Sequence, residues 1–148
     1  MCKDANIVSL TEEIWERFVP ELSSFPYYTL TNNSLTKQEL FTTGMNFAII
    51  KEDDILAIVG ATRTLEFTLE VSIITSATFK DNKRLCVNKI HKVFYENLPK
   101  DICRLEGHVD IEDKRALRFA NFFGFESVGV RSRLGKDKKT YVLVEKLI

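Results

Sequence analysis

Residues 46–75 contain three successive stretches with the composition of β-strands, and this segment decides the class of fold. Asn46–Lys51 and Ile55–Thr64 flank the polar sequence Glu52-Asp53-Asp54, which predicts an antiparallel hairpin with a tight turn. Leu65–Thr75 then alternates strictly between apolar and polar residues, so we expect a third strand of the same sheet. One face of this strand would carry Leu65, Phe67, Leu69, Val71 and Ile73, and the other Glu66, Thr68, Glu70 and Ser72.

A helical pattern follows the three strands. Apolar residues at Cys86, Val87, Ile90, Val93 and Phe94 recur at helical spacing until Asn97-Leu98-Pro99 ends the helix. Ile102–Val109 is the next strand. A strand, a helix of more than three turns and another strand form a right-handed crossover, so we expect this strand to run parallel to the one before the helix.

The C-terminal third contains one more helix and two strands. Asp113 is placed to cap a helix over Lys114–Phe123, and Gly124 stands at the position that ends it. We expect the apolar face of this helix to be buried against the sheet. Two strands, Phe125–Arg131 and Thr140–Lys146, then flank a basic turn.

The N-terminal third begins with a strand and a helix. Ala5–Leu10 is a short apolar run, and Thr11 is placed to cap a helix that carries Ile14, Trp15 and Phe18 on one face. Pro20 and Pro26 interrupt the chain before a short helix over 36–41. The whole order predicts a single α+β domain over residues 1–148, with a mixed, mostly antiparallel central sheet and helices on both faces.

Charge and cysteine content exclude several classes of function. The formal net charge is zero, so no overall field favours nucleic acid or a membrane surface. Charge is nevertheless uneven, because residues 80–100 and 114–148 are basic and the remainder is acidic. Three widely spaced cysteines, with only two histidines, predict a reducing compartment and no metal site. The opening MCKDANIV lacks the apolar run of a signal peptide, so we expect a cytoplasmic protein without a membrane span.

The segment from Asp113 to Phe125 resembles a known family. Its sequence, DKRALRFANFFGF, resembles the Asn-x-x-Ala-(x)7-Gly-Phe helix-turn-strand of the GNAT superfamily, the Gcn5-related N-acetyltransferases. The predicted order of elements is also theirs, so the resemblance covers nearly the whole chain. It implies that acetyl-CoA enters a gap between the two parallel strands and that its pyrophosphate lies at the start of the crossover helix. The implied cofactor contacts are Ala77, Phe79, Lys80, Asn82, Lys83, Arg84, Leu85 and Asp113.

The chain departs from the family pattern at three points. The Gln/Arg-x-x-Gly-x-Gly/Ala phosphate loop is absent, because no glycine occurs between Gly60 and Gly107, and Lys80, Lys83 and Arg84 would have to supply charge instead. Ala120 stands where the family often has a tyrosine that protonates the leaving thiolate. Asp113 replaces the usual asparagine, and its carboxylate is compatible with the cofactor only if it caps the helix.

Acetyl transfer to an amine needs a group that accepts the proton of the amine. Glu70 and Glu66 are the best-placed carboxylates, since the alternation puts both on one face of the strand that enters the gap. His108 is a weaker candidate that is better explained as a packed or capping histidine. Tyr27, Tyr28 and Tyr141 either line the acceptor side or complete the core. Cys86 lies on an apolar helix face, which favours a packed thiol over a nucleophile.

Two functions of different class remain open at the level of sequence. The first is an acetyl-CoA-dependent N-acetyltransferase that acts on an amine of a small molecule or protein. The second is a GNAT-fold protein that has lost acetyl transfer and serves as a binding or structural component, because some phage-encoded relatives, a virion protein among them, have equally eroded phosphate loops. Nucleic-acid binding is a weaker third, supported only by Arg131, Arg133, Lys136, Lys138 and Lys139. The sequence is compatible with a monomer or a homodimer.

Overall fold

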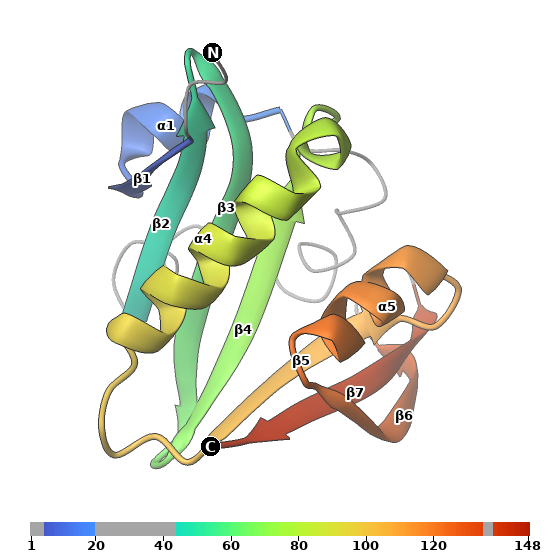
Figure 1. The fold of residues 1–148 in the computed structure, drawn as a ribbon. Helices are drawn as coiled ribbons and strands as arrows, with labels where there is room; N and C mark the ends of the chain where they lie inside the picture. Colours follow the sequence, from blue (N-terminus) through green and yellow to red (C-terminus); the bar gives the residue numbers. More distant parts are fainter. Residues whose placement is uncertain (1–4, 20–43, 135–137) are drawn as a thin grey trace.

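The computed structural model describes residues 5–19, 44–134 and 138–148, and Figure 1 shows their arrangement around one seven-stranded sheet. The strand order is β1-β2-β3-β4-β5-β7-β6, and every pairing is antiparallel except that of β4 with β5. The predicted α+β class with a mixed, mostly antiparallel sheet is therefore confirmed. The strands are β1 (Asn6–Ser9), β2 (Gly44–Lys51), β3 (Asp54–Leu65), β4 (Thr68–Thr75), β5 (Arg104–Asp110), β6 (Glu126–Leu134) and β7 (Lys139–Leu147).

Helices cover both faces of the sheet, as predicted. On one face, α4 (Lys83–Glu96) crosses β2, β3 and β4, while α5 (Lys114–Phe122) lies over β5 and β7 (Figure 1). A short 3-10 helix, η2 (Phe79–Asn82), leads into α4. On the opposite face, α1 (Glu12–Arg17) packs its Ile14 and Trp15 on the second hydrophobic layer, which includes Ala48 and Ile58. We call these two surfaces the α4 face and the α1 face.

The predicted helix caps are confirmed in detail. Thr11 Oγ1 accepts a hydrogen bond of 3.2 Å from the backbone N–H of Ile14, and Asp113 Oδ1 accepts one of 3.0 Å from that of Ala116. Gly124 has φ +87°, the left-handed conformation that lets the chain leave α5 and enter β6. The predictions for Pro20, Pro26, Tyr27, Tyr28 and the helix over 36–41 lie outside the described residues.

The predicted strand over Leu65–Thr75 is wrong at its start. Leu65 is the last residue of β3, Glu66 and Phe67 form a turn, and β4 begins at Thr68. The Arg63 guanidinium stabilises this turn, because it donates to the backbone carbonyl of Glu66. Leu65 and Phe67 are 64% and 47% exposed. The alternation at these two residues therefore does not mark a buried strand face, because the chain reverses there at the end of the sheet.

Helix α5, the helix of the C-terminal third, is less buried than predicted. No residue within α5 is fully buried, and Phe123, the residue that follows its last turn, is the one that reaches the core. Phe119 packs on the margin of the same core. The apolar face of α5 is instead turned toward a cavity beside β4 and β5, which forms the candidate site.

Candidate functional site

The site originates in a split between the two parallel strands. β4 and β5 pair over three positions, Thr68 with Arg104, Leu69 with Leu105 and Glu70 with Glu106, and no pair follows within these strands. β4 nevertheless stays paired with β3 as far as Thr75, and β5 stays paired with β7 as far as Asp110. The two halves of the sheet therefore diverge beyond Glu70 and Glu106, as Figure 1 shows for β4 and β5.

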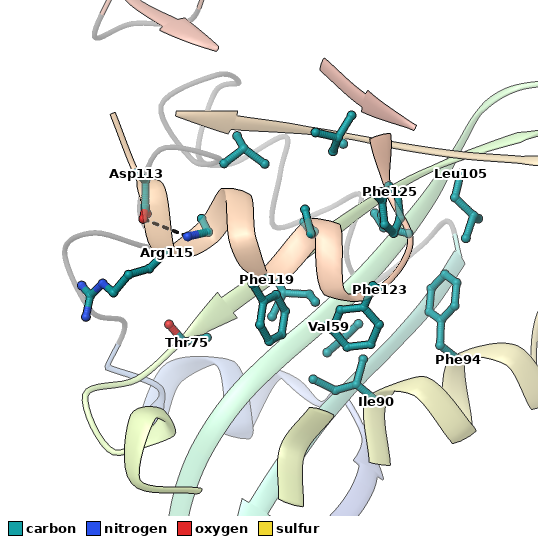
Figure 2. A pocket seen from close by; sticks show the side chains of 18 of the residues that line it. Val59, Thr75, Ile90, Phe94, Leu105, Asp113, Arg115, Phe119, Phe123 and Phe125 are labelled. Carbon is teal, nitrogen blue, oxygen red and sulfur yellow. Dashed lines mark hydrogen bonds between the residues drawn. The ribbon is translucent and has the colours of Figure 1, made fainter. Parts of the chain in front are cut away.

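A cavity of about 270 Å³ occupies this split. Val71 and Gly107 line it from the α4 face, while Ser72 and His108 line it from the α1 face, so the cavity lies between the strands. Helices α4 and α5 form its roof. In Figure 2, Phe119 and Phe123 point from α5 toward Val59 and Ile90, which makes this wall apolar.

Gly107 sets the width of the split at its narrow end. A Cβ atom at this position would lie 3.3 Å from the carbonyl oxygen of Val71 and 3.6 Å from a methyl group of Val144. The position directly follows the last paired residue of β5. Glycine therefore allows the two strands to stay close where the cavity begins.

His108 and Glu70 form a pair where the split opens. His108 Nδ1 lies 3.1 Å from Glu70 Oε1, and the His108 side chain is only 8% exposed. An ionised carboxylate only accepts hydrogen bonds, so Nδ1 carries a proton, and in the neutral imidazole Nε2 keeps its lone pair. Nε2 is buried and has no hydrogen-bond partner in the part of the chain that the structure describes, and the residue lines the cavity.

This geometry changes the assignment made for the two glutamates. Glu70 is on β4 as predicted, but it is absent from the cavity lining and reaches the cavity through His108. Glu66 lies in the turn between β3 and β4, at the paired end of these strands, so the prediction that it shares a strand face with Glu70 is wrong. The contact between His108 and Glu70 was not predicted, because it depends on strand register. The expectation of a packed histidine is confirmed by its burial.

The segment expected to form a phosphate loop is helical. Phe79 donates its backbone N–H to Ser76, η2 follows, and its last residue leads directly into α4. Without a glycine, no residue in this segment adopts a positive φ that would turn its N–H groups outward. Asn82 Oδ1 accepts a hydrogen bond of 2.9 Å from Lys51 Nζ, and its Nδ2 donates to the Thr78 carbonyl, so the side chain connects η2 to β2.

Four of the eight predicted cofactor contacts line the cavity. Phe79 forms part of its wall, with its ring 5.8 Å from that of Phe119. Lys80 and Lys83 lie at the cavity with exposed side chains, and Asp113 lines it while capping α5. The other four are outside the lining: Ala77 and Arg84 are exposed, Leu85 packs on the core and Asn82 binds Lys51.

Arg115 lines the cavity and was missed by the sequence analysis. It extends from the first turn of α5 on the side where Asp113 and Thr75 lie (Figure 2). Together with Lys80 of η2 and Lys83 of α4, it brings three cationic side chains to the site. The sequence showed that residues 114–148 are basic. It did not show that Arg115 reaches the cavity, because this depends on where α5 begins.

Two further residues provide neither a proton donor nor a reactive thiol. Ala120 lines it and carries no group that could donate a proton. Cys86 is completely buried on the apolar face of α4, and burial raises the pKa of its thiol to about 11. The expectation of a packed thiol is therefore confirmed.

No protein-family model matches this chain, and no curated protein sequence matches it. Solved structures do match. A GNAT family acetyltransferase from Elizabethkingia anophelis, with acetyl-CoA bound, has a TM-score of 0.70 and 16% identity over 98% of this chain and 99% of that chain. Ard1 from Thermoplasma volcanium has a TM-score of 0.74 and 10% identity, with 99% of each chain covered. An N-acetyltransferase from Staphylococcus aureus has a TM-score of 0.67 and 13% identity over 98% and 99%.

These likenesses define the class of protein by its architecture. At such low identity they show the fold alone, and the fold is that of the GNAT acetyltransferases, as the resemblance over Asp113–Phe125 implied. The likeness extends over nearly the full length of the chain and of these neighbours. In addition, no described helix has the length and apolar character required to cross a bilayer.

Proposed function

We propose that this chain is an acetyl-CoA-dependent N-acetyltransferase that transfers an acetyl group to an amine. The observation that carries the proposal is the split itself: pairing of β4 with β5 stops after Glu70, a cavity fills the gap, and cationic side chains lie at it. Two parallel strands that separate while each keeps its other neighbour lose backbone hydrogen bonds, which lowers the stability of the sheet. The gap between them offers the kind of space in which a ligand binds.

The residues present fit the proposed cofactor. Its slender pantetheine chain suits the apolar walls formed by residues such as Val71, Val109 and Phe119, and Lys80, Lys83 and Arg115 supply positive charge for its phosphates. The start of α4 adds the positive end of a helix dipole. Asp113 is engaged as the cap of α5, which moderates its repulsion of phosphate. Acetyl-CoA, when bound, supplies the acetyl group activated as a thioester.

The proton of the amine is accepted by His108 in this proposal. Nε2 is a buried acceptor without a partner among the described residues, and Glu70 fixes the tautomer and the ring orientation through Nδ1. His108 is thus the catalytic residue, and Glu70 is a positioning residue. His108 is buried, with only 8% of its side chain exposed, which limits the contact of bulk water with its ring.

Binding without transfer is the second candidate, and two observations favour it. Ala120 leaves the thiolate without an acid from that position, and the phosphate-side segment has no glycine loop. A protein of this kind would bind CoA compounds, or another ligand of the same shape, and release no product. Turnover measurements separate the two functions.

The first experiment measures acetyl-CoA binding by isothermal titration calorimetry. Lys80→Glu with Lys83→Glu should weaken binding about tenfold or more, because attraction to the phosphates becomes repulsion. Arg84→Glu is the matched control, since Arg84 is equally exposed but lies outside the cavity lining, and it should change affinity much less. Equal losses in both variants would contradict the proposed placement.

The second experiment measures release of CoA in the presence of an amine acceptor. His108→Gln should lower kcat about 100-fold, the usual contribution of a general base, while the KM for acetyl-CoA stays similar. Glu70→Gln should lower kcat less, because a neutral amide still accepts a hydrogen bond from Nδ1. Glu66→Gln serves as the control in the turn. Full activity of the His108 variant would refute the assignment.

A further inference from the structure

The sheet carries a row of glutamates on the α1 face beside the split. Glu70 of β4 stands opposite Glu106 of β5, Glu106 stands opposite Glu145 of β7, and Glu145 stands opposite Glu126 of β6. Residues directly opposite each other in a sheet project from the same face. We call these four residues the glutamate row.

The glutamate row has too few cations within the described residues to balance it. Like charges directly opposite each other destabilise a sheet, and here three such pairs follow one another. Arg104 alone joins the row, with its Nη2 3.2 Å from Glu106 and 2.9 Å from Glu145. With a neutral His108, the row and Arg104 together carry a formal charge of −3. A bound cation would relieve this repulsion.

A second observation connects the glutamate row to the cavity at His108. His108, whose side chain is buried, contacts Glu70 through Nδ1 and lines the cavity, and its Nε2 has no partner among the described residues. The other glutamates continue from this point toward the edge of the sheet. Glu106 and Glu145 are 15% and 24% exposed, so a ligand can reach them. A ligand held by His108 would therefore have carboxylates along one side.

The spacing of the row indicates the shape of the cation. Neighbouring strands lie about 5 Å apart, so the row extends over roughly 15 Å from β4 to β6. The described residues contain no group of three or more His, Cys, Asp or Glu side chains close enough to hold a metal ion. An extended organic cation with several separated positive charges matches such a row, whereas a compact ion would contact only part of it.

We propose that the acceptor is a linear polyamine, with its reacting nitrogen at His108 and its distal ammonium groups along Glu106, Glu145 and Glu126. This inference rests on the proposed acetyl transfer. In that reaction the amine nitrogen forms the amide bond, the thioester C–S bond breaks, and His108 Nε2 receives the proton of the attacking amine. CoA leaves as the thiolate and takes a proton from solvent, to which His108 returns its own.

The test compares spermidine with butylamine, which has a single charge. Spermidine should show a kcat/KM at least about tenfold higher, and added NaCl should reduce this preference. Glu106→Gln with Glu145→Gln should remove most of the preference. Glu126→Gln, which leaves both Arg104 ion pairs intact, should lower it in part even if the double variant folds poorly. Glu96→Gln, exposed at the end of α4, is the control that should keep it.

The outcomes separate the two proposals. If acetyl-CoA is bound and both amines react equally well, or if a lysine peptide reacts better than spermidine, the polyamine assignment is overturned and acetyl transfer stands. If acetyl-CoA is not bound, the proposed function fails. Calorimetric titration of spermidine into the protein alone then tests whether the glutamate row binds a polyamine. Binding that the Glu106 and Glu145 substitutions abolish would support it, and absence of binding would refute it.

Discussion

Gly107 provides the sharpest test of the split, because a methyl group there meets backbone. Gly107→Ala would place a Cβ atom 3.3 Å from the Val71 carbonyl oxygen, a separation that requires β4 or β5 to move by a few tenths of an ångström. β4 is held on its other side by pairing with β3, with Val71 opposite Ala61, so it cannot give way freely. This contact lies where β4 and β5 begin to diverge. A strand movement that relieves it would therefore widen the narrow end of the cavity.

The magnitude follows from two opposed effects. Replacing a strand glycine with alanine ordinarily stabilises by about 0.5–1 kcal/mol, because it restricts the unfolded chain. The close contact should cancel that gain, so we expect Gly107→Ala to be neutral or about 1 kcal/mol less stable than the parent. Gly107→Val adds a branched side chain between Val71 and Val144 and should cost about 1–3 kcal/mol as overpacking.

Urea denaturation of matched variants measures this prediction. Gly129→Ala is the control, since a Cβ atom at Gly129 on β6 meets nothing within 4 Å. It should be as stable as the parent or slightly more so, which separates it from Gly107→Ala by about 1 kcal/mol, or about 2–4 °C in Tm for a chain of this size. Equal stability of the two alanine variants, together with an unaffected Gly107→Val, would refute the role of Gly107 in the split.

Three further predictions concern stability and are measured by the same denaturation experiment. Gly124→Ala should cost about 1 kcal/mol because the residue has φ +87°; no loss would mean that the chain leaves α5 in another conformation. Asp113→Ala should cost about 1 kcal/mol through loss of the cap, and Asp113→Asn should restore most of it; equal losses would contradict capping. Burial raises the pKa of Cys86 from 9.0 to about 11, so the unfolded chain loses this proton first as pH rises. Stability should therefore fall between pH 9 and 11 by up to about 2–3 kcal/mol, and Cys86→Ala should lack this component; parallel pH profiles would contradict it.

Local rules predicted most of the fold because they act within a few residues. Thr11 and Asp113 each cap the helix that follows, and the spacing of Cys86, Ile90 and Phe94 defines the buried side of α4. The start of β4 was missed because the sequence from Leu65 to Phe67 has no glycine, proline or asparagine to mark a turn. That reversal depends instead on antiparallel pairing of β3 with β4 and on the Arg63 side chain.

The site was only partly predictable because its residues come together through pairing between distant strands. Lys80 and Lys83 could be found, since both stand at the start of the crossover helix. The contact between His108 and Glu70 could not, because one shift in the register of β5 would turn His108 to the other face. Phe79 was expected to lie in a loop before the crossover helix, but it begins the 3-10 helix η2.

The short β4–β5 ladder gives these separate features a common origin. Pairing that ends at Glu70 leaves His108 with a strand partner on one side only, Leu143 of β7, and with the cavity and the Glu70 carboxylate on the side of β4. A longer ladder would close the cavity and leave Gly107 without a function. A shorter one would lose the register that sets Glu70 opposite Glu106 and starts the glutamate row. The position at which the two strands separate therefore determines the cavity, the surroundings of the proposed proton acceptor and the start of the glutamate row together.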